Sequence, residues 1–149
     1  MNTDSKILLD SNILVYSEDR RYPERQMKAI EFLDKCGEER IGVLSIQNLA
    51  EFSNVLFIKV KNLSSHDINE RIRDLSIDFE LIHYNINTLI KANDYYERFK
   101  TDFFDALLAA TMEENNIHII ATENVDHFKS IPWIIVINPF KEEKSRLNR

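Results

Sequence analysis

Four acidic side chains of this sequence fall where a strand ends or a helix begins. Asp10 closes the apolar run "KILLD", and Asp126 follows another such run within "IIATENVDHF". Glu51 in "LSIQNLAEF" and Asp105 in "TDFFDALLAATM" fall in the first or second turn of segments with helical apolar spacing. Because ligands of open parallel sheets collect beyond the carboxyl ends of the strands, we expect these carboxylates to meet at one edge.

Carboxylates gathered in this way would repel one another and stay partly protonated unless cations neutralise them. A cluster of oxygen ligands suits Mg²⁺ or Mn²⁺, which also accept phosphate oxygens. Taken singly, each acid has a simpler explanation: Asp10 and Asp126 as turn residues, Glu51 as an exposed helix residue and Asp105 as part of a helix cap. Their joint placement at the same end of successive strand-helix units favours a metal site.

The elements that would position these acids are five short β-rich runs with helical segments between them. The runs are "KILL", "RIGVL", "FELIHY", "HIIA" and "WIIVI". This alternation predicts an α/β fold of three layers, in which helices cover both faces of a central, mostly parallel sheet of about five strands. Two helical segments carry apolar stripes, formed by Met27, Ile30 and Leu33 in one and by Ile86, Leu89 or Ile90, Asn93 and Tyr96 in the other.

The length of 149 residues predicts one domain, residues 1–140, followed by a solvated tail at 141–149. A single cysteine, Cys36, excludes an internal disulfide and favours the cytoplasm, and no apolar run is long enough for a membrane helix or has the pattern of a signal peptide. The net charge of −6 excludes a uniformly basic nucleic-acid surface. It does not exclude nucleic acid, because bound cations reverse the local sign of an acidic site.

Three segments, "LLDSNILVY", "LSIQNLAEF" and "FFDALLAAT", resemble in order the motifs of the PIN-domain nucleases, whose small bacterial and archaeal members include the VapC-type toxins of toxin-antitoxin pairs. The segment "IIATENVDHF" followed by "NPF" is similar to the closing segment of that family. The resemblance spans roughly residues 6–140. It implies a PIN-like fold and a metal-dependent ribonuclease in which metal-bound water hydrolyses RNA phosphodiester bonds.

The resemblance also assigns roles to residues. Asp10, Glu51 and Asp105 would be catalytic metal ligands, and the side chains of Ser11, Asn12, Ser45 and Thr122 would support them through hydrogen bonds. The fourth acid departs from the family pattern, because the usual positions hold Asn124 and His127. We expect Asp126 to supply the fourth carboxylate, with Asn124, Glu123 or a water as alternatives.

Partners follow from the same resemblance. A toxin would have a cognate antitoxin that lays an apolar helix and an Arg or Lys over the acidic site, and homodimers are common in the family. The basic residues after the first motif either flank the RNA or form a solvated helix face; they are Arg20, Arg21, Arg25 and Lys28. The histidines have no metal-ligand spacing, which favours packing roles for them.

Three other enzyme or cofactor classes fit the sequence less well. A phosphatase with an aspartyl nucleophile would need a second Asp where Asn12 stands, and a response-regulator receiver would need an Asp after the third strand. Dinucleotide binding would need more than two glycines. The alternative that stays open is a PIN-like module that binds RNA or a protein partner with a weakened metal site.

Overall fold

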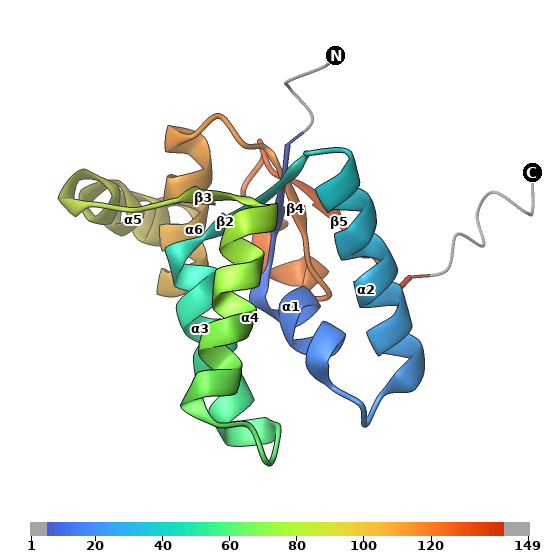
Figure 1. Cartoon of the computed structure of the whole chain (residues 1–149). Coiled ribbons are helices and arrows are strands. Elements are labelled where there is room, and N and C mark those ends of the chain that lie inside the picture. Colours follow the sequence, from blue (N-terminus) through green and yellow to red (C-terminus); the bar gives the residue numbers. More distant parts are fainter. Residues whose placement is uncertain (1–5, 142–149) are drawn as a thin grey trace, which may run out of the picture.

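The computed structural model describes residues 6–141 and is built on a five-stranded sheet (Figure 1). All strand pairs are parallel and the order is β3-β2-β1-β4-β5, which confirms the predicted α/β fold. Each strand overlaps one of the five apolar runs: β1 (Ile7–Leu9), β2 (Gly42–Ser45), β3 (Glu80–Ile82), β4 (Ile119–Ala121) and β5 (Ile135–Ile137). The predicted tail lies, apart from Lys141, outside the described residues.

Helices cover both faces of this sheet, so the three-layer prediction is confirmed. One face packs against α1 (Ser11–Glu18), α2 (Pro23–Glu38), α3 (Ile46–Lys59) and α4 (Ser65–Asp78). The other packs against α5 (Ile86–Phe99) and α6 (Phe103–Glu114). None of the helices in the described part of the chain has the length and apolar character of a membrane span.

The central strand β1 contributes side chains to the hydrophobic cores on both faces of the sheet. Ile7 and Leu9 point into the core on the α1 side, and Leu8 points into the core on the α6 side, as the two-residue period of a strand requires. Leu8 and Leu9 are both fully buried. Such a strand reads as a continuous apolar run, which is how parallel strands buried on both faces appear in a sequence.

Polar residues directly after the strands begin the helices. Asp10 follows β1 and caps α1 by accepting a hydrogen bond from the backbone N–H of Ser11 at 2.8 Å. Ser45 ends β2 and caps α3, accepting from the N–H of Asn48 at 3.0 Å. Both caps satisfy helix N–H groups that have no partner within the helix, and both bring polar side chains to the carboxyl edge of the sheet.

Apart from Leu33, the residues of the two apolar stripes expected from helical spacing do not face the core. Met27 on α2 and Ile90 on α5 are each 63% exposed. The buried faces carry smaller residues instead: Ala29, Leu33 and Cys36 on α2, and Thr88, Ala92 and Tyr95 on α5. Small side chains let a helix approach the sheet closely, so the buried face is not the one with the largest apolar residues.

Candidate metal and RNA site

The strand order reverses at β1, which has β2 on one side and β4 on the other. This is the switch point at which open parallel sheets bind ligands. A pocket of about 1360 Å³ opens there, larger than the roughly 300–1,000 Å³ of small-molecule sites, which suits a polymeric substrate. Most of the predicted site residues line it: Asp10, Ser11, Asn12, Glu51, Asp105, Glu123, Asn124 and Asp126.

Asp10 is the most enclosed of the acids, with 9% of its surface exposed. Its Oδ2 accepts from the hydroxyl of Thr122 at 2.7 Å and from the amide of Asn12 at 3.4 Å. Its Oδ1 accepts from the Asn48 amide at 3.2 Å as well as from the backbone of α1. Burial raises the pKa of Asp10 above its usual value, although the hydrogen bonds from Thr122 and Ser11 oppose that rise.

Glu51 approaches from the second turn of α3 and is half-buried, as its position in the sequence predicts. The Ser11 hydroxyl donates to its Oε2 at 3.0 Å, and the amide of Gln47 donates to its Oε1 at 3.1 Å. The same Gln47 amide donates to the backbone carbonyl of Phe104 at 2.9 Å. Gln47 therefore links the carboxylate on α3 to the first turn of α6.

Asp105 lies in that first turn, where Asp102 caps the helix through the N–H of Phe104. Its Oδ2 is 3.3 Å from Nδ1 of His127. Burial, together with the nearby carboxylates of Asp102, Asp10 and Glu51, raises the pKa of Asp105 to about 6, while His127 acts in the opposite direction. The raised pKa reflects mainly the burial of this carboxyl group, with smaller contributions from the neighbouring carboxylates.

The fourth position lies in η2 (Val125–Phe128) and the residues before it. Asp126 lines the pocket, but its side chain is 85% exposed and lies 3.5 Å from the ammonium of Lys129. Glu123 pairs with Arg25 of α2. Asn124 donates its backbone N–H to Thr122 Oγ1 at 3.0 Å, and its side chain is exposed. Of these three residues, Glu123 is the one whose carboxylate is paired with Arg25. The side chains of Asn124 and Asp126 do not take part in that pair.

The donor set suits a hard divalent cation, since carboxylate and amide oxygens dominate it. Within residues 6–141, however, no three carboxylate, imidazole or thiol groups are drawn together tightly enough to enclose an ion. The oxygens of Asp10 are occupied by amide and hydroxyl donors instead. The residues therefore fit such an ion by their chemistry and by their placement around one pocket.

Three polar residues of this site were missed in the sequence. Asn48 was part of a helix face, yet it is fully buried and donates to Asp10. Its signal was the spacing Ser-x-x-Asn from Ser45, which donates its hydroxyl to Asn48 Oδ1 at 2.7 Å. Gln47 carried no comparable signal. His127 was expected at the surface or in strand-end packing; its side chain is 53% exposed, and its contact with Asp105 is what the sequence did not indicate.

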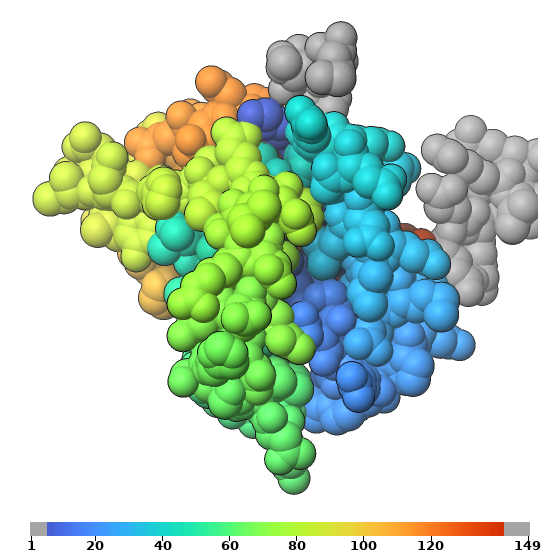
Figure 2. Space-filling view, viewed as in Figure 1, coloured from blue at the N-terminus to red at the C-terminus, as the bar shows by residue number. Residues whose placement is uncertain are grey.

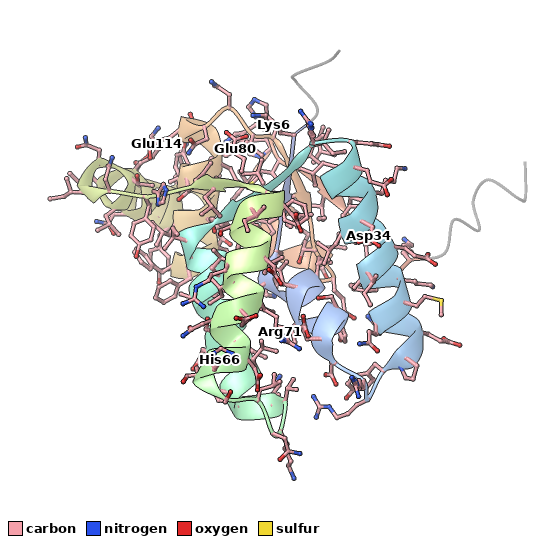
Figure 3. All side chains as sticks on the ribbon, in the orientation of Figure 1. Lys6, Asp34, His66, Arg71, Glu80 and Glu114 are labelled. Atoms are coloured by element: carbon pink, nitrogen blue, oxygen red, sulfur yellow. The ribbon has the colours of Figure 1, made fainter. Side chains whose placement is uncertain are left out.

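A second hollow, of about 550 Å³, lies outside this site, between α2 and α4 (Figure 2). Its apolar floor includes Leu33, Leu75 and Phe79, and its rim carries the four carboxylates of Glu18, Asp34, Glu38 and Asp78. Figure 3 shows Asp34 on α2 and Arg71 on α4, whose guanidinium binds Glu18 at 2.9 Å. We refer to this hollow as the acidic groove.

Comparisons with known proteins agree with this architecture. The family model described as PIN domain matches residues 7–134. No functionally curated protein has significant sequence similarity to the chain.

Solved structures with the same fold cover nearly the whole chain. A toxin-antitoxin complex from Klebsiella pneumoniae has a TM-score of 0.67 at 20% identity, covering 92% of this chain and 100% of that one. VapBC2 from Rickettsia felis, bound to a promoter DNA fragment, has a TM-score of 0.67 at 19% identity, covering 89% and 97%. VapC20 from Mycobacterium tuberculosis, a toxin that cleaves the sarcin-ricin loop, has a TM-score of 0.62 at 14% identity, covering 87% and 97%. At these identities the likeness is one of fold.

Proposed function

Because the chain belongs to the PIN domain family, we propose that it is a metal-dependent ribonuclease that hydrolyses RNA phosphodiester bonds and serves as the toxin of a toxin-antitoxin pair. One observation carries the proposal: carboxylates from three separate elements, β1–α1, α3 and α6, line a single pocket at the switch point of the sheet. The raised pKa of Asp105, to which Asp10 and Glu51 contribute, supports their closeness. Toxins among the structural neighbours support the biological role.

The proposed roles follow from the geometry. Asp10, Glu51 and Asp105 would hold Mg²⁺ or Mn²⁺, and Asp126 or Asn124 would face the pocket as the fourth group. A bound divalent cation supplies the charge that activates water and neutralises a phosphate. Thr122 and Asn48 keep Asp10 oriented through hydrogen bonds, and Ser11 with Gln47 does the same for Glu51. Glu51, half-buried beside the pocket, is the group that would accept a proton from water.

The test is cleavage of an RNA mixture with Mg²⁺, Mn²⁺ or EDTA. We expect cleavage with either metal, none with EDTA, and a loss of more than about 100-fold for Asp10→Asn, since even the partners of a metal ligand are worth about 10- to 100-fold. Asp34→Asn is the matched control, because it removes the same charge from α2 at the rim of the acidic groove, outside the candidate catalytic pocket (Figure 3).

The alternative, a binding module with a weakened metal site, gives a different result. RNA binding without cleavage, unchanged by EDTA and by Asp10→Asn, would favour the module and end the proposal of a nuclease. Replacement of the expected carboxylate by His127 is the observation that makes this outcome worth testing.

The proposed partner is an antitoxin encoded beside this chain, and a homodimer in the cytoplasm is the proposed state of the toxin. The acidic groove supports a protein partner, because its apolar floor and four carboxylates are complementary to an amphipathic segment rich in Lys and Arg. Expression of the chain alone should arrest growth, and co-expression of the neighbouring reading frame should relieve the arrest. If Asp10→Asn arrests growth as strongly, the toxicity does not come from this site.

A further inference from the structure

An aromatic ring stands exposed beside the candidate catalytic carboxylates. Phe104 immediately precedes Asp105, lines the same pocket and is 60% exposed. Its backbone is fixed at both polar groups, because its N–H donates to Asp102 at 3.0 Å and its carbonyl accepts from the Gln47 amide at 2.9 Å. The ring is therefore held on a rigid support while much of its surface stays in water.

Folding does not account for this exposure. Phe residues contribute to stability when they are buried, and within residues 6–141 the one aromatic contact of this ring is an edge contact with Phe103, with centroids 5.4 Å apart. A second ring, Tyr84, lies just after β3, is 41% exposed and lines the same pocket. Phe104 in the first turn of α6 and Tyr84 between β3 and α5 thus reach one acidic pocket from different elements, and Tyr22, 49% exposed, lines it as well.

Two lysine side chains also line the pocket beside the exposed rings. Lys100 ends α5 in the left-handed region with φ of 52°, lines the pocket, and forms no salt bridge with any residue of 6–141. Lys59, at the end of α3, also lines the pocket. The carboxylates of Asp10 and Glu51 form the inner part of the site. Positive charge around them is complementary to phosphates on either side of the reacting bond.

We propose that Phe104, assisted by Tyr84, is a stacking platform for unpaired bases of single-stranded RNA, and that Lys100 contacts the adjacent phosphate. The inference rests on the proposed ribonuclease function and adds the side chains that would hold the bases and the phosphate of the RNA. Every base has a flat π face that can stack on an aromatic ring, but in a duplex those faces are covered by neighbouring base pairs. Rings interspersed with Lys side chains favour RNA over a protein partner, which would need a continuous apolar surface.

The experiment measures binding of a fluorescently labelled single-stranded RNA by anisotropy, in the uncleaving Asp10→Asn background with Mg²⁺. Stacking is worth about 1–3 kcal/mol per base, so Phe104→Ala should raise the Kd about 10-fold. Phe104→Leu should weaken binding similarly, because it is apolar without a π face, whereas Phe104→Trp should bind as tightly as the parent. Phe57→Ala is the matched control: Phe57 is 58% exposed on α3 and does not line the pocket.

Three outcomes would contradict the proposed stacking platform. They are unchanged RNA affinity in Phe104→Ala, an equal loss of affinity for a duplex of the same sequence, and full RNA affinity in Phe104→Leu. Loss of a protein partner with RNA affinity unchanged would assign the ring to a protein interface instead. Equal melting temperatures for the variants check that the fold is intact. Failure of the ribonuclease proposal is seen separately, as absence of cleavage by the unmodified chain with any metal.

Discussion

At the scale of single residues, the site depends on Asp10 being held in place while buried. Four side-chain or backbone donors surround its two oxygens, and the shortest bond comes from Thr122. The Thr122 hydroxyl also accepts from Asn12 at 3.0 Å and from the N–H of Asn124 at 3.0 Å. One hydroxyl therefore joins the ends of β1 and β4 to the loop that leads into η2.

The first prediction concerns the removal of the Thr122 hydroxyl. Thr122→Val keeps the side-chain shape but removes the shortest of the four hydrogen bonds to the Asp10 carboxylate and the acceptor of the Asn12 amide and the Asn124 N–H, so the free energy of unfolding should fall by about 2 kcal/mol. Urea unfolding at pH 7 measures the difference, and Thr122→Ser, which keeps the hydroxyl, is the control. A Val variant as stable as the Ser variant would show that the hydroxyl has no such role.

Asp105 leads to a second prediction, on pH. Its pKa rises to about 6 on folding from an ordinary value of 3.8. The folded state then binds this proton more tightly than the unfolded state, so stability falls as the pH rises from about 4 to 6. In EDTA at pH 7, Asp105→Asn should be more stable by about 1–2 kcal/mol, less than the full shift implies because solvent screens this partly exposed group.

Urea unfolding of both proteins at pH 4 and pH 7 tests this, and the difference should vanish at pH 4. Asp94→Asn, which removes an exposed carboxylate of α5, should change little at either pH. An Asn variant that is less stable than the parent at pH 7 would mean that the His127 contact outweighs burial and repulsion.

Residue types and their order were sufficient to predict much of this site. Asp10, Glu51 and Asp105 do reach one pocket, and Ser11, Asn12 and Thr122 do donate to the acids. Gln47 and Asn48 could not be predicted in the same way, since an amide on a helix has many possible partners and only the packing of α3 against β1 and α6 selects them. The same applies to His127, whose neighbour is 22 positions away, on another helix.

At the scale of elements, close contact between a strand and its neighbours restricts one glycine. A Cβ built on Gly42 in β2 would lie 2.5 Å from the ring of Phe79, which precedes β3. Gly42→Ala should therefore lower the free energy of unfolding by about 1–3 kcal/mol through overpacking. Thermal or urea unfolding measures the loss, and adding Phe79→Leu should restore part of it.

Gly37 provides the matched control for that change. It lies in α2, and a Cβ there would meet Phe79 only at 3.9 Å, an ordinary contact distance. Gly37→Ala should be neutral or stabilising by up to about 1 kcal/mol, because Ala is the better helix former. Equal losses at both positions would contradict the packing explanation.

The positions of the elements followed from the sequence better than their orientation did. Apolar runs and helical spacing located the strands and helices, but on α5 the apolar residues Ile86 and Ile90 face outward. Periodicity identifies that a helix has faces; it does not identify which face meets the sheet when small residues such as Ala92 can approach more closely. That choice is made by the complementary surface, which a single sequence does not display.

At the scale of the whole molecule, ion binding should be linked to stability. A ligand that binds only the folded state stabilises it by RT ln(1 + [L]/Kd), about 1.4 kcal/mol at ten times the Kd. For a chain of 149 residues this corresponds to a rise in melting temperature of roughly 3 to 6 °C with Mn²⁺ or Mg²⁺. Asp10→Asn and Asp105→Asn should abolish the rise, and Asp34→Asn should retain it.

The hydrogen bond between Thr122 and Asp10 also affects when the site can form during synthesis of the chain. The two partners are 112 positions apart, and β1 cannot complete its pairing in the sheet until β4 exists. During translation, the first motif leaves the ribosome early, but its carboxylate gains the last of its four donors only after Thr122 has been made. A growing chain would thus carry an incomplete site near the RNA of the ribosome that makes it, and the proposed capacity to cut RNA would be complete only as synthesis ends.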